Sequence, residues 1–404
     1  MIPATVQPRE NPSNGIAPFQ PTSWVGGDSL IFPHGAIQGL AAQFADLYSQ
    51  YLECPWEFLA FAFLTALGSM ITGSVTLESE ITIQPRLYTI LLGESADDRK
   101  STSLNKVTGL FESVFPTFIP CNGVGSAEGL AGWITGHPST ILKFDELKSF
   151  VSKANIESSI LLTCVGSLFE ENQFHNHTKG HSIAIDNGHL SILAASTIDT
   201  YDTMWNPQFK NIGFMNRLWL VPGRGERRFS TPKPIPQPSI DAIKAALQSL
   251  ITSLQSTGGP LRLHLTPEGY RVFDRWYMGQ GRSIHTKRLD TYGHRLMVLF
   301  AVNEGKGEVD EGIAERVVRL LEWQLRVRQT HDPLGAEGRV ARMEENIRRA
   351  LNGGGGKMKK RSLQQKVHYE RDGLTVWNIA IDNLVKAKEI GLVNGWYELV
   401  KCEE

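Results

Sequence analysis

Hydrophobic positions in the first part of the chain recur with the period of helices. One run places apolar residues at helical spacing: Ile37, Leu40, Phe44, Leu47 and Tyr51. This spacing predicts an amphipathic helix, and Pro55 is suited to open a second one. The next stretch, residues 56–73, is the most apolar of the chain. It is short, rich in small residues and contains Glu57, so we expect a buried helix rather than a membrane span.

From Val75 the pattern changes to that of strands. Residues 74–84 alternate as a strand or hairpin would. Apolar, β-rich runs follow at 86–92, 139–146, 182–187, 189–197 and 216–223. Helical patterns lie between them, at 100–115 and 156–171. Strands that alternate with helices predict an α/β domain with a largely parallel sheet.

Changes in composition divide the chain into five segments. We expect an extended arm rich in Pro, Asn and Gly (1–33), N-terminal helices (34–74), an α/β core (75–230), a mainly helical subdomain (231–335) and a C-terminal domain (336–404). The proline-dense stretch 227–239 marks one boundary and residues 330–338 another. The last domain reads as three helices followed by a hairpin at Asn394-Gly395, which is the order of a winged-helix domain.

Charge and cysteine content narrow the class of protein. The net charge is −1, so any contact with nucleic acid depends on a local basic surface. The 4 cysteines include no closely spaced pair, which argues against a zinc ribbon or disulfide scaffold and fits a reducing cytosol. The N-terminal residues lack the basic and apolar regions of a signal peptide. We therefore expect a cytoplasmic protein without a membrane role.

The stretch LLGESADDRKSTSLNK, residues 91–106, is the strongest candidate for a functional motif in the sequence. An apolar strand ends at Gly93, and Lys100, Ser101 and Thr102 open an amphipathic helix. In a phosphate-binding loop, backbone N–H groups wrap the phosphates, a lysine reaches the terminal phosphates and a hydroxyl ligates Mg²⁺. Here Arg99 replaces the usual glycine, and Gly93 precedes Lys100 by seven residues rather than six. Taken alone, an ordinary strand-to-helix turn remains the alternative.

Two further strand ends carry polar residues that suit the same site. The strand 139–146 ends in Asp145-Glu146. The first acid would hold the Mg²⁺ shell, and the second would orient and deprotonate the attacking water. The strand 189–197 ends in Ser196-Thr197, either of which would sense the γ-phosphate or the water. A solvated acidic turn and a plain strand-end cap are the corresponding structural alternatives.

An arginine stands before the next strand. Arg217 follows a glycine-containing turn, where an arginine finger is often placed, and would act on the nucleotide of a neighbouring subunit. A surface or salt-bridged arginine is the alternative. Arg224, Arg227 and Arg228 are further candidates for the finger.

Three motifs together resemble the P-loop proteins of phages, plasmids and integrated elements that are described as helicase- or primase-helicase-like. The matching residues are Arg99-Lys100-Ser101, Asp145-Glu146-Leu147, and Gly213, Phe214 and Arg217. The resemblance covers about residues 35–330. It implies a RecA-like or AAA-like P-loop NTPase core, with Gly93, Ser95, Arg99, Lys100, Ser101 and Thr102 around the nucleotide. Asp97 and Asp98 depart from the pattern, because they stand where glycines usually line the phosphates and would repel ATP unless they point outward. We expect both side chains to point away from the phosphates.

The resemblance and the motifs together predict a DNA-dependent ATP hydrolase, with a replicative helicase of a mobile element as the leading interpretation. ATP and Mg²⁺ would lie between the subunits of a ring, a hexamer by expectation, that moves on single-stranded DNA. A separate primase or initiator is a further expected partner. One alternative is a weakly active or inactive DNA-binding initiator or scaffold. Another is a regulatory ATPase of transposition or packaging.

Basic residues outside the core predict where DNA would bind. Lys179 lies in the segment HNHTKGH (175–181), whose histidines form no complete metal site in the sequence. Four basic residues precede the hairpin of the last domain: Lys357, Lys359, Lys360 and Arg361. Beside a winged-helix pattern they would contact the phosphates of duplex DNA. A solvated charged face or a protein-docking lid is the alternative.

Overall fold

The structure is a computed structural model, and it describes residues 30–94, 97–177, 182–205, 209, 213–256, 259–281, 283–331, 339–371, 373–393 and 395–400. Within these ranges the chain divides into two compact units. The first unit comprises residues 32–331, and the second contains residues 339–400. Each unit is described by itself below.

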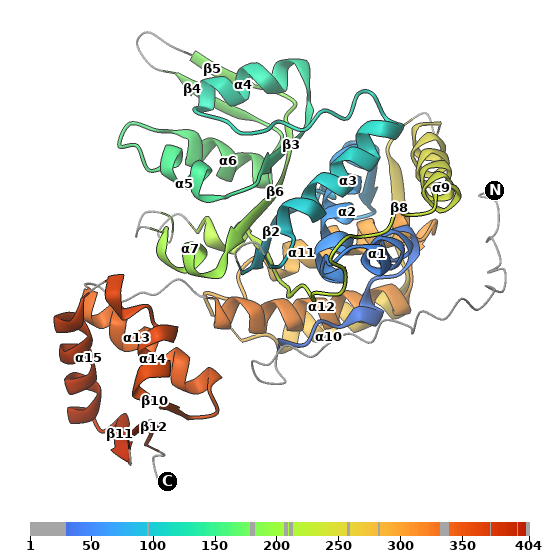
Figure 1. The fold of residues 1–404 in the computed structure, drawn as a ribbon. Coiled ribbons are helices and arrows are strands. Elements are labelled where there is room, and N and C mark those ends of the chain that lie inside the picture. Colours follow the sequence, from blue (N-terminus) through green and yellow to red (C-terminus); the bar gives the residue numbers. More distant parts are fainter. Residues whose placement is uncertain are drawn as a thin grey trace, which may run out of the picture. The chain divides into compact units, whose positions relative to one another are not determined.

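The first unit is built around a four-stranded parallel sheet with the strand order β3-β6-β2-β7 (Figure 1). The strands are β2 (Tyr88–Gly93), β3 (Ser139–Phe144), β6 (His189–Thr197) and β7 (Trp219–Pro222). All pairings are parallel, so the carboxyl ends of the strands share one edge. The mixed α/β architecture with a parallel sheet is thus confirmed.

Helices cover the sheet and extend beyond it. The helical elements up to β7 are η2 (His34–Ala36), α1 (Gly39–Tyr51), α2 (Trp56–Ile71), α3 (Lys100–Val114), α4 (Ala127–Gly136), α5 (Lys148–Ala154), α6 (Leu161–Glu170), α7 (Ile198–Thr203) and η3 (Met215–Arg217). After β7 come α9 (Gln237–Gln255), α10 (Pro267–Gly279), α11 (Leu289–Asn303) and α12 (Glu311–Thr330). Figure 1 shows α2 and α3 on one side of the sheet and α5 and α6 on the other.

The apolar stretch after Pro55 forms α2, which contacts all four strands of the sheet. Almost every side chain of this helix is buried, as expected for a helix that is apolar all round. Within the described parts of the chain, no helix is both long and apolar enough to cross a membrane. α2 therefore forms the centre of the core, in agreement with the buried helix predicted here.

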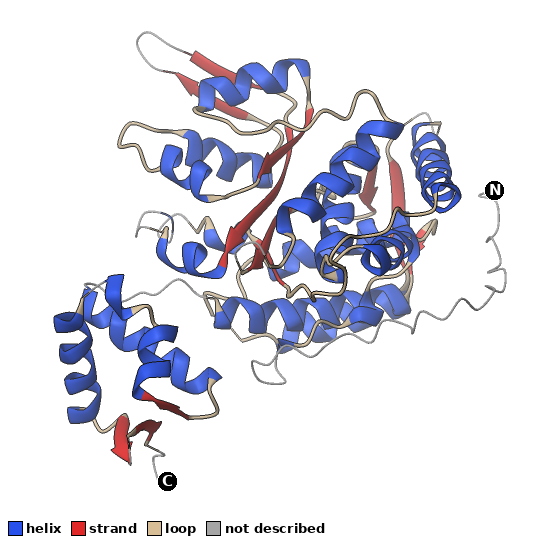
Figure 2. Cartoon of the chain, in the orientation of Figure 1, coloured by secondary structure: helices blue, strands red, loops and turns tan. Residues whose placement is uncertain are grey.

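Two smaller sheets correct the strand predictions (Figure 2). β1 (Val75–Leu77) ends early and pairs in parallel with β8 (Leu261–Leu265), which in turn pairs with β9 (Glu308–Val309). The expected strand or hairpin over 74–84 is therefore wrong beyond Leu77. β5 (Ser182–Ile185) pairs antiparallel with β4 (Phe174–His177) instead of joining the parallel sheet. Its side chains alternate between exposed and buried, as in a strand with one solvated face.

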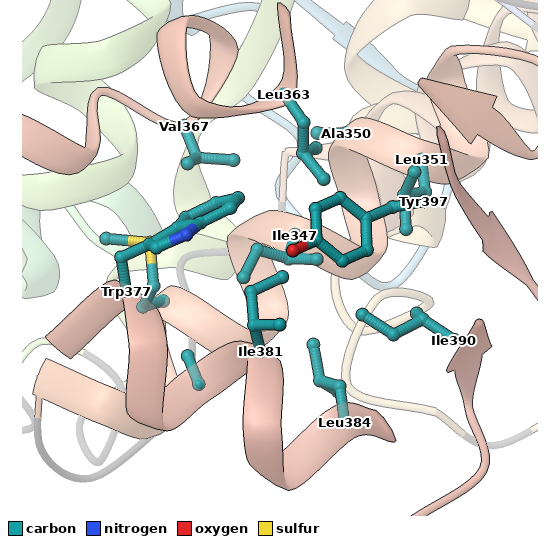
Figure 3. Packing of buried hydrophobic residues seen from close by; sticks show 12 residues of the cluster. Ile347, Ala350, Leu351, Leu363, Val367, Trp377, Ile381, Leu384, Ile390 and Tyr397 are labelled. Atoms are coloured by element: carbon teal, nitrogen blue, oxygen red, sulfur yellow. The ribbon is translucent and has the colours of Figure 1, made fainter. Parts of the chain in front are cut away.

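The second unit contains three helices and a small antiparallel sheet. Its elements are α13 (Arg339–Gly353), β10 (Lys357–Lys359), α14 (Lys360–Lys366), η4 (Tyr369–Arg371), α15 (Leu374–Lys386), β11 (Ile390–Val393) and β12 (Trp396–Leu399). The sheet order is β10-β12-β11. The terminal hairpin agrees with the prediction, and the basic residues that precede it form β10 and the start of α14. From its sequence, the stretch before this helix is expected to be a turn, and β10 corrects that expectation. Figure 3 shows the core of this unit, where Trp377 and Tyr397 pack among aliphatic side chains from every helix.

The packing of α2 generates a stability prediction for two glycines. A Cβ on Gly68 would lie 2.0 Å from the carbonyl oxygen of Pro85, whereas a Cβ on the exposed Gly109 of α3 would meet nothing within 4 Å. We expect Gly68→Ala to destabilise the protein by about 1–3 kcal/mol or more, because the core cannot yield. Gly109→Ala should stabilise it by about 0.5–1 kcal/mol, because alanine is the better helix former. Urea unfolding of both variants measures the difference, and equal effects would contradict the close approach.

Candidate functional site

The candidate site lies at the edge of the parallel sheet where β2, β3 and β6 end. β6 separates β2 from β3, and its last residues, Ser196 and Thr197, lie opposite Leu92 and Gly93. The carboxyl edge of a parallel sheet is the usual place for a ligand in an α/β fold. The structure thus brings to one edge the three strand ends that the sequence selected.

Lys100 is the first residue of α3 and turns back onto the loop that precedes it. Its Nζ donates hydrogen bonds to the carbonyl oxygens of Gly93 at 2.9 Å and Glu94 at 2.6 Å. Burial lowers the pKa of the Lys100 ammonium, against the raising effect of the Asp98, Glu146 and Glu94 carboxylates. The Glu146 carboxylate is therefore close enough to Lys100 to raise the pKa of its ammonium.

The hydroxyl-bearing neighbours of Lys100 lie at the start of the same helix. Ser101 is exposed and Thr102 is half-buried. Ser95, the remaining loop residue that the resemblance places at the nucleotide, falls outside the described residues. The first turn of α3 therefore offers the Ser101 hydroxyl to the solvent side of the site.

Of the two polar residues at the end of β6, only one reaches the acidic pair. The buried Ser196 hydroxyl donates to Glu146 Oε1 at 2.9 Å. Thr197 instead caps α7, because its Oγ1 accepts the backbone N–H of Thr200 at 3.1 Å. Asp145 is exposed beside Glu146. Of the two candidates, Ser196 is thus the one that contacts Glu146, and Thr197 is a helix cap.

The two acids of the loop have different surroundings. The Asp97 side chain is 54% exposed and forms an ion pair with Arg227 at 2.6 Å, and the hydrogen bond from Arg227 lowers the pKa of Asp97. Asp98 is buried: one oxygen accepts the N–H of Glu94, and the other accepts the N–H of Gly225 at 2.7 Å. A Cβ on Gly93 would lie 2.7 Å from the Asp98 carboxylate, so this approach requires glycine. The expectation of an outward side chain is wrong for Asp98.

Arg99 anchors the loop through a residue that the sequence did not indicate. It adopts a left-handed backbone conformation (φ 49°), and its guanidinium pairs with Glu53 at 2.6 Å. Glu53 also accepts the backbone N–H groups of Arg228 at 2.6 Å and Phe229 at 2.9 Å. Hydrogen bonds from Phe229, Arg99 and Arg228 lower the pKa of Glu53 to about 2. The Arg99 guanidinium is therefore fixed on Glu53.

Arg217 lies at the other edge of the sheet. It ends η3, directly before β7, whereas the loop follows the carboxyl end of β2. Its side chain is 13% exposed, lies 3.5 Å from Glu170 and donates to the Gly213 carbonyl at 3.1 Å. Arg288 contacts the same Glu170 carboxylate. Arg217 does not reach the candidate site of its own chain.

The further arginine candidates lie after β7. Arg228 donates to the carbonyl oxygens of Ser49 and Leu52, and Arg227 pairs with Asp97. Arg224 is exposed, and its charge contributes to lowering the pKa of Asp97. All three lie on the side of the loop that faces β7.

The predicted DNA-contacting residues are exposed where the structure describes them. Lys357 and Lys359 lie on β10, and Lys360 and Arg361 open α14. The Lys359 ammonium lies 5.3 Å from the ring centroid of Trp396. Lys179 falls outside the described residues, beyond the end of β4.

The histidines of the β4–β5 hairpin have other partners. His175 pairs with Asp186 at 2.8 Å, and His177 hydrogen-bonds the Ser182 hydroxyl at 2.7 Å. Among the residues that the structure describes, no group of three or more His, Cys, Asp or Glu side chains is placed to hold a metal ion.

No protein-family model matches this chain, and no curated protein matches it in sequence.

The contacts of Glu53 predict a pH dependence of stability. Because its pKa falls from 4.5 to about 2 on folding, the carboxylate stabilises the protein fully above pH 4.5. That stabilisation is lost as the pH falls toward 2. At pH 7 we expect Glu53→Gln to cost about 2 kcal/mol. Between pH 4.5 and 2 the gap between wild type and variant should close.

Denaturant unfolding at several pH values measures this gap. Glu112→Gln, an exposed carboxylate on α3, is the matched control and should follow the wild type at every pH. A gap for Glu53→Gln that stays constant between pH 4.5 and 2 would contradict the assignment.

Proposed function

We propose that this protein is a DNA-dependent ATP hydrolase that uses the loop 93–100 as its phosphate site. The observation that carries the proposal is the contact of Ser196 with Glu146, 2.9 Å apart at neighbouring strand ends, where the Glu146 carboxylate is close enough to raise the pKa of Lys100 at the start of α3. A base held by a hydroxyl next to a phosphate-binding lysine is the arrangement that hydrolysis of a phosphoanhydride requires. No other cluster described above combines these three groups.

Each residue of the site has a role in this proposal. Lys100 would exchange the carbonyls of Gly93 and Glu94 for the β- and γ-phosphates of ATP. Glu146 would accept the proton of the attacking water, and Ser196 would fix the orientation of the Glu146 carboxylate. At the edge of the sheet, water and nucleotide would both reach Glu146 from the solvent side.

The oxygen donors of the site fit Mg²⁺ bound together with a nucleotide. Ser101 and Asp145 are both exposed and offer hydroxyl and carboxylate oxygens. No cluster of protein ligands in the described parts of the chain would hold the ion alone. This suits Mg²⁺, which binds through one or two protein oxygens together with phosphates. When bound, it would neutralise the negative charge that develops on the phosphates.

The proposal includes a RecA-like or AAA-like core that works in a ring, and the strand order is the support for the core. The strand that bears Ser196 separates the lysine strand from the acidic strand. Arg217 lies at the opposite edge from its own loop, so it would act as a finger only on the nucleotide of a neighbouring copy. In a ring of six copies, Arg217 would have to leave Glu170 to reach the nucleotide of the next copy. In such a ring Lys179, which lies between β4 and β5 in the sequence, would contact single-stranded DNA in the central channel.

The second unit would contact duplex DNA as a winged-helix domain. Its three helices and antiparallel hairpin suit this assignment, and the exposed Lys357, Lys359, Lys360 and Arg361 would contact phosphates. A replicative helicase of a phage, plasmid or other mobile element combines such parts. This interpretation depends on ATP hydrolysis in the first unit.

A second candidate function rests on Asp98. Its carboxylate already accepts the N–H of Glu94, a backbone group that a bound phosphate would use. A loop that is organised by its own acid suits a weakly active or inactive DNA-binding initiator or scaffold. The two candidates differ in whether single-stranded DNA stimulates ATP hydrolysis.

Substitutions of Lys100 and Glu146 test the leading candidate. Lys100→Ala should abolish both ATP binding and hydrolysis, because the phosphates lose their cation. Glu146→Gln should retain binding and lower kcat by about 10²–10⁴-fold, because only the base is removed. Phosphate release is measured with Mg²⁺, with and without a single-stranded oligonucleotide. Lys106→Ala, an exposed lysine on the same helix, is the control and should behave as the wild type. A wild type without hydrolysis under these conditions would favour the initiator or scaffold.

Removal of the Ser196 hydroxyl and removal of the Thr197 hydroxyl should affect different properties of the protein. Ser196→Ala should lower kcat about tenfold or more with little change in KM, because Glu146 loses its partner. Thr197→Ala should instead cost about 1 kcal/mol of stability, because α7 loses its N-cap. Steady-state kinetics and thermal unfolding of both variants measure the two effects. A loss of kcat in Thr197→Ala that equals that in Ser196→Ala would contradict these roles.

A further inference from the structure

The segment after β7, residues 223–229 (GRGERRF), lies along the phosphate loop and is named here the arginine strap. The N–H of Gly223 donates to the Leu92 carbonyl at 3.0 Å, and the N–H of Gly225 donates to Asp98 at 2.7 Å. A Cβ on Gly225 would lie 2.8 Å from the carbonyl oxygen of Asp97. The strap therefore packs directly against the backbone of the loop, and its Arg227 side chain contacts Asp97 of the loop.

Several hydrogen bonds fix the end of the strap at Arg228 and Phe229. Arg228 donates to two backbone carbonyls, and the N–H groups of Arg228 and Phe229 donate to the buried Glu53. Glu53 also holds Arg99 of the loop. One carboxylate thus ties the strap and the loop together, so the position of Arg227 relative to the loop is set by the fold.

Arg227 itself is held only weakly. Its side chain is 83% exposed, and its ion pair with Asp97 at 2.6 Å joins two solvated groups. Exposed pairs of this kind contribute little to stability. A group with more negative charge than a single carboxylate, such as a triphosphate, would compete effectively for the guanidinium, which matches phosphate oxygens in geometry.

Asp97 stands in the segment between Gly93 and Lys100 whose backbone would wrap the phosphates. The guanidinium on Asp97 is therefore at the rim of the proposed phosphate site. This arrangement also accounts for the two acids in the loop. The Asp98 carboxylate accepts hydrogen bonds from two backbone N–H groups, and the charge of Asp97 is compensated by Arg227.

We propose that Arg227 is a phosphate-binding residue of this site, held by Asp97 when the site is empty and transferred to the phosphates when a nucleoside triphosphate binds. The inference rests on the proposed function, which supplies the ligand. It adds a cation from the same chain to Lys100, and it makes Asp97 a competitor of the nucleotide. Binding then replaces one ion pair with another, and no covalent step is involved.

The two members of the pair should have opposite effects on affinity. Arg227→Ala removes a ligand of the phosphates and should weaken binding about tenfold. Asp97→Asn releases Arg227 and should strengthen binding several-fold. If the pair only supported the loop, both substitutions would weaken binding. If Asp97 only repelled phosphate, Asp97→Asn would strengthen binding by the same factor whether or not Arg227 is present. The double variant Asp97→Asn with Arg227→Ala therefore distinguishes simple repulsion from competition for Arg227.

The experiment is a fluorescence titration of the full chain with a labelled ATP analogue and Mg²⁺. It compares the wild type, both single variants, the double variant and Arg227→Lys, which keeps the charge but loses the planar fork and should recover part of the affinity. Arg271→Ala and Glu268→Gln are matched controls, because they break an exposed Arg–Glu pair on α10. Both should bind as the wild type does. Thermal unfolding of each variant verifies that the first unit is folded.

The outcomes separate this inference from the proposed function. Binding by the wild type that is lost in Lys100→Ala but unchanged in Arg227→Ala would overturn the inference and leave the phosphate site in place. Weaker binding in both single variants, or an equal gain from Asp97→Asn in both backgrounds, would also overturn it. A wild type that binds no nucleotide would overturn the inference and the phosphate site together.

Discussion

The buried carboxylate of Glu53 is the interaction on which the candidate site depends. It accepts hydrogen bonds from the guanidinium of Arg99, at the start of α3, and from two backbone N–H groups of the arginine strap. Three segments that are remote in sequence therefore meet at one charge. A buried carboxylate is stable only with such partners. The loss of any one of these contacts would therefore destabilise the loop, the strap and the end of α1 together.

This constraint explains how a loop with acids in place of glycines keeps a defined shape. A glycine-rich loop is ordered by the phosphate that it binds, because its free N–H groups need an acceptor. Here Asp98 supplies an acceptor from within the loop, and Glu53 fixes the adjoining arginine. Asp98 and Arg99 are therefore held by contacts within the protein itself. A phosphate that binds at this loop would have to displace the Asp98 carboxylate or bind beside it.

The sequence predicted the parts of this site that have a local signal. The buried strands β2, β3 and β6 are continuous apolar runs, and their polar ends identified Lys100, Glu146 and the Ser196-Thr197 pair. It could not choose between Ser196 and Thr197, because neighbouring residues of a strand point to opposite faces of the sheet and the sequence does not show on which face Glu146 lies.

The contacts between remote segments had no signal in the sequence. The Glu53–Arg99 pair spans 46 positions and the Gly225–Asp98 contact spans 127. Such pairs follow no periodicity and require no particular composition, so the tertiary fold alone brings them together. The early end of β1 has a similar cause, because its partner β8 lies far along the chain.

The separate core of the second unit affects how the protein unfolds. Met343, Ile347, Trp377, Leu384 and Tyr397 pack with one another and with further side chains of the same unit. A unit with its own core melts with its own midpoint and its own heat of unfolding. We therefore expect two heat-absorption peaks in calorimetry rather than one. A ligand of the first unit would move one peak, and DNA held by the basic residues of the second unit would move the other, so each peak would report which unit a ligand occupies.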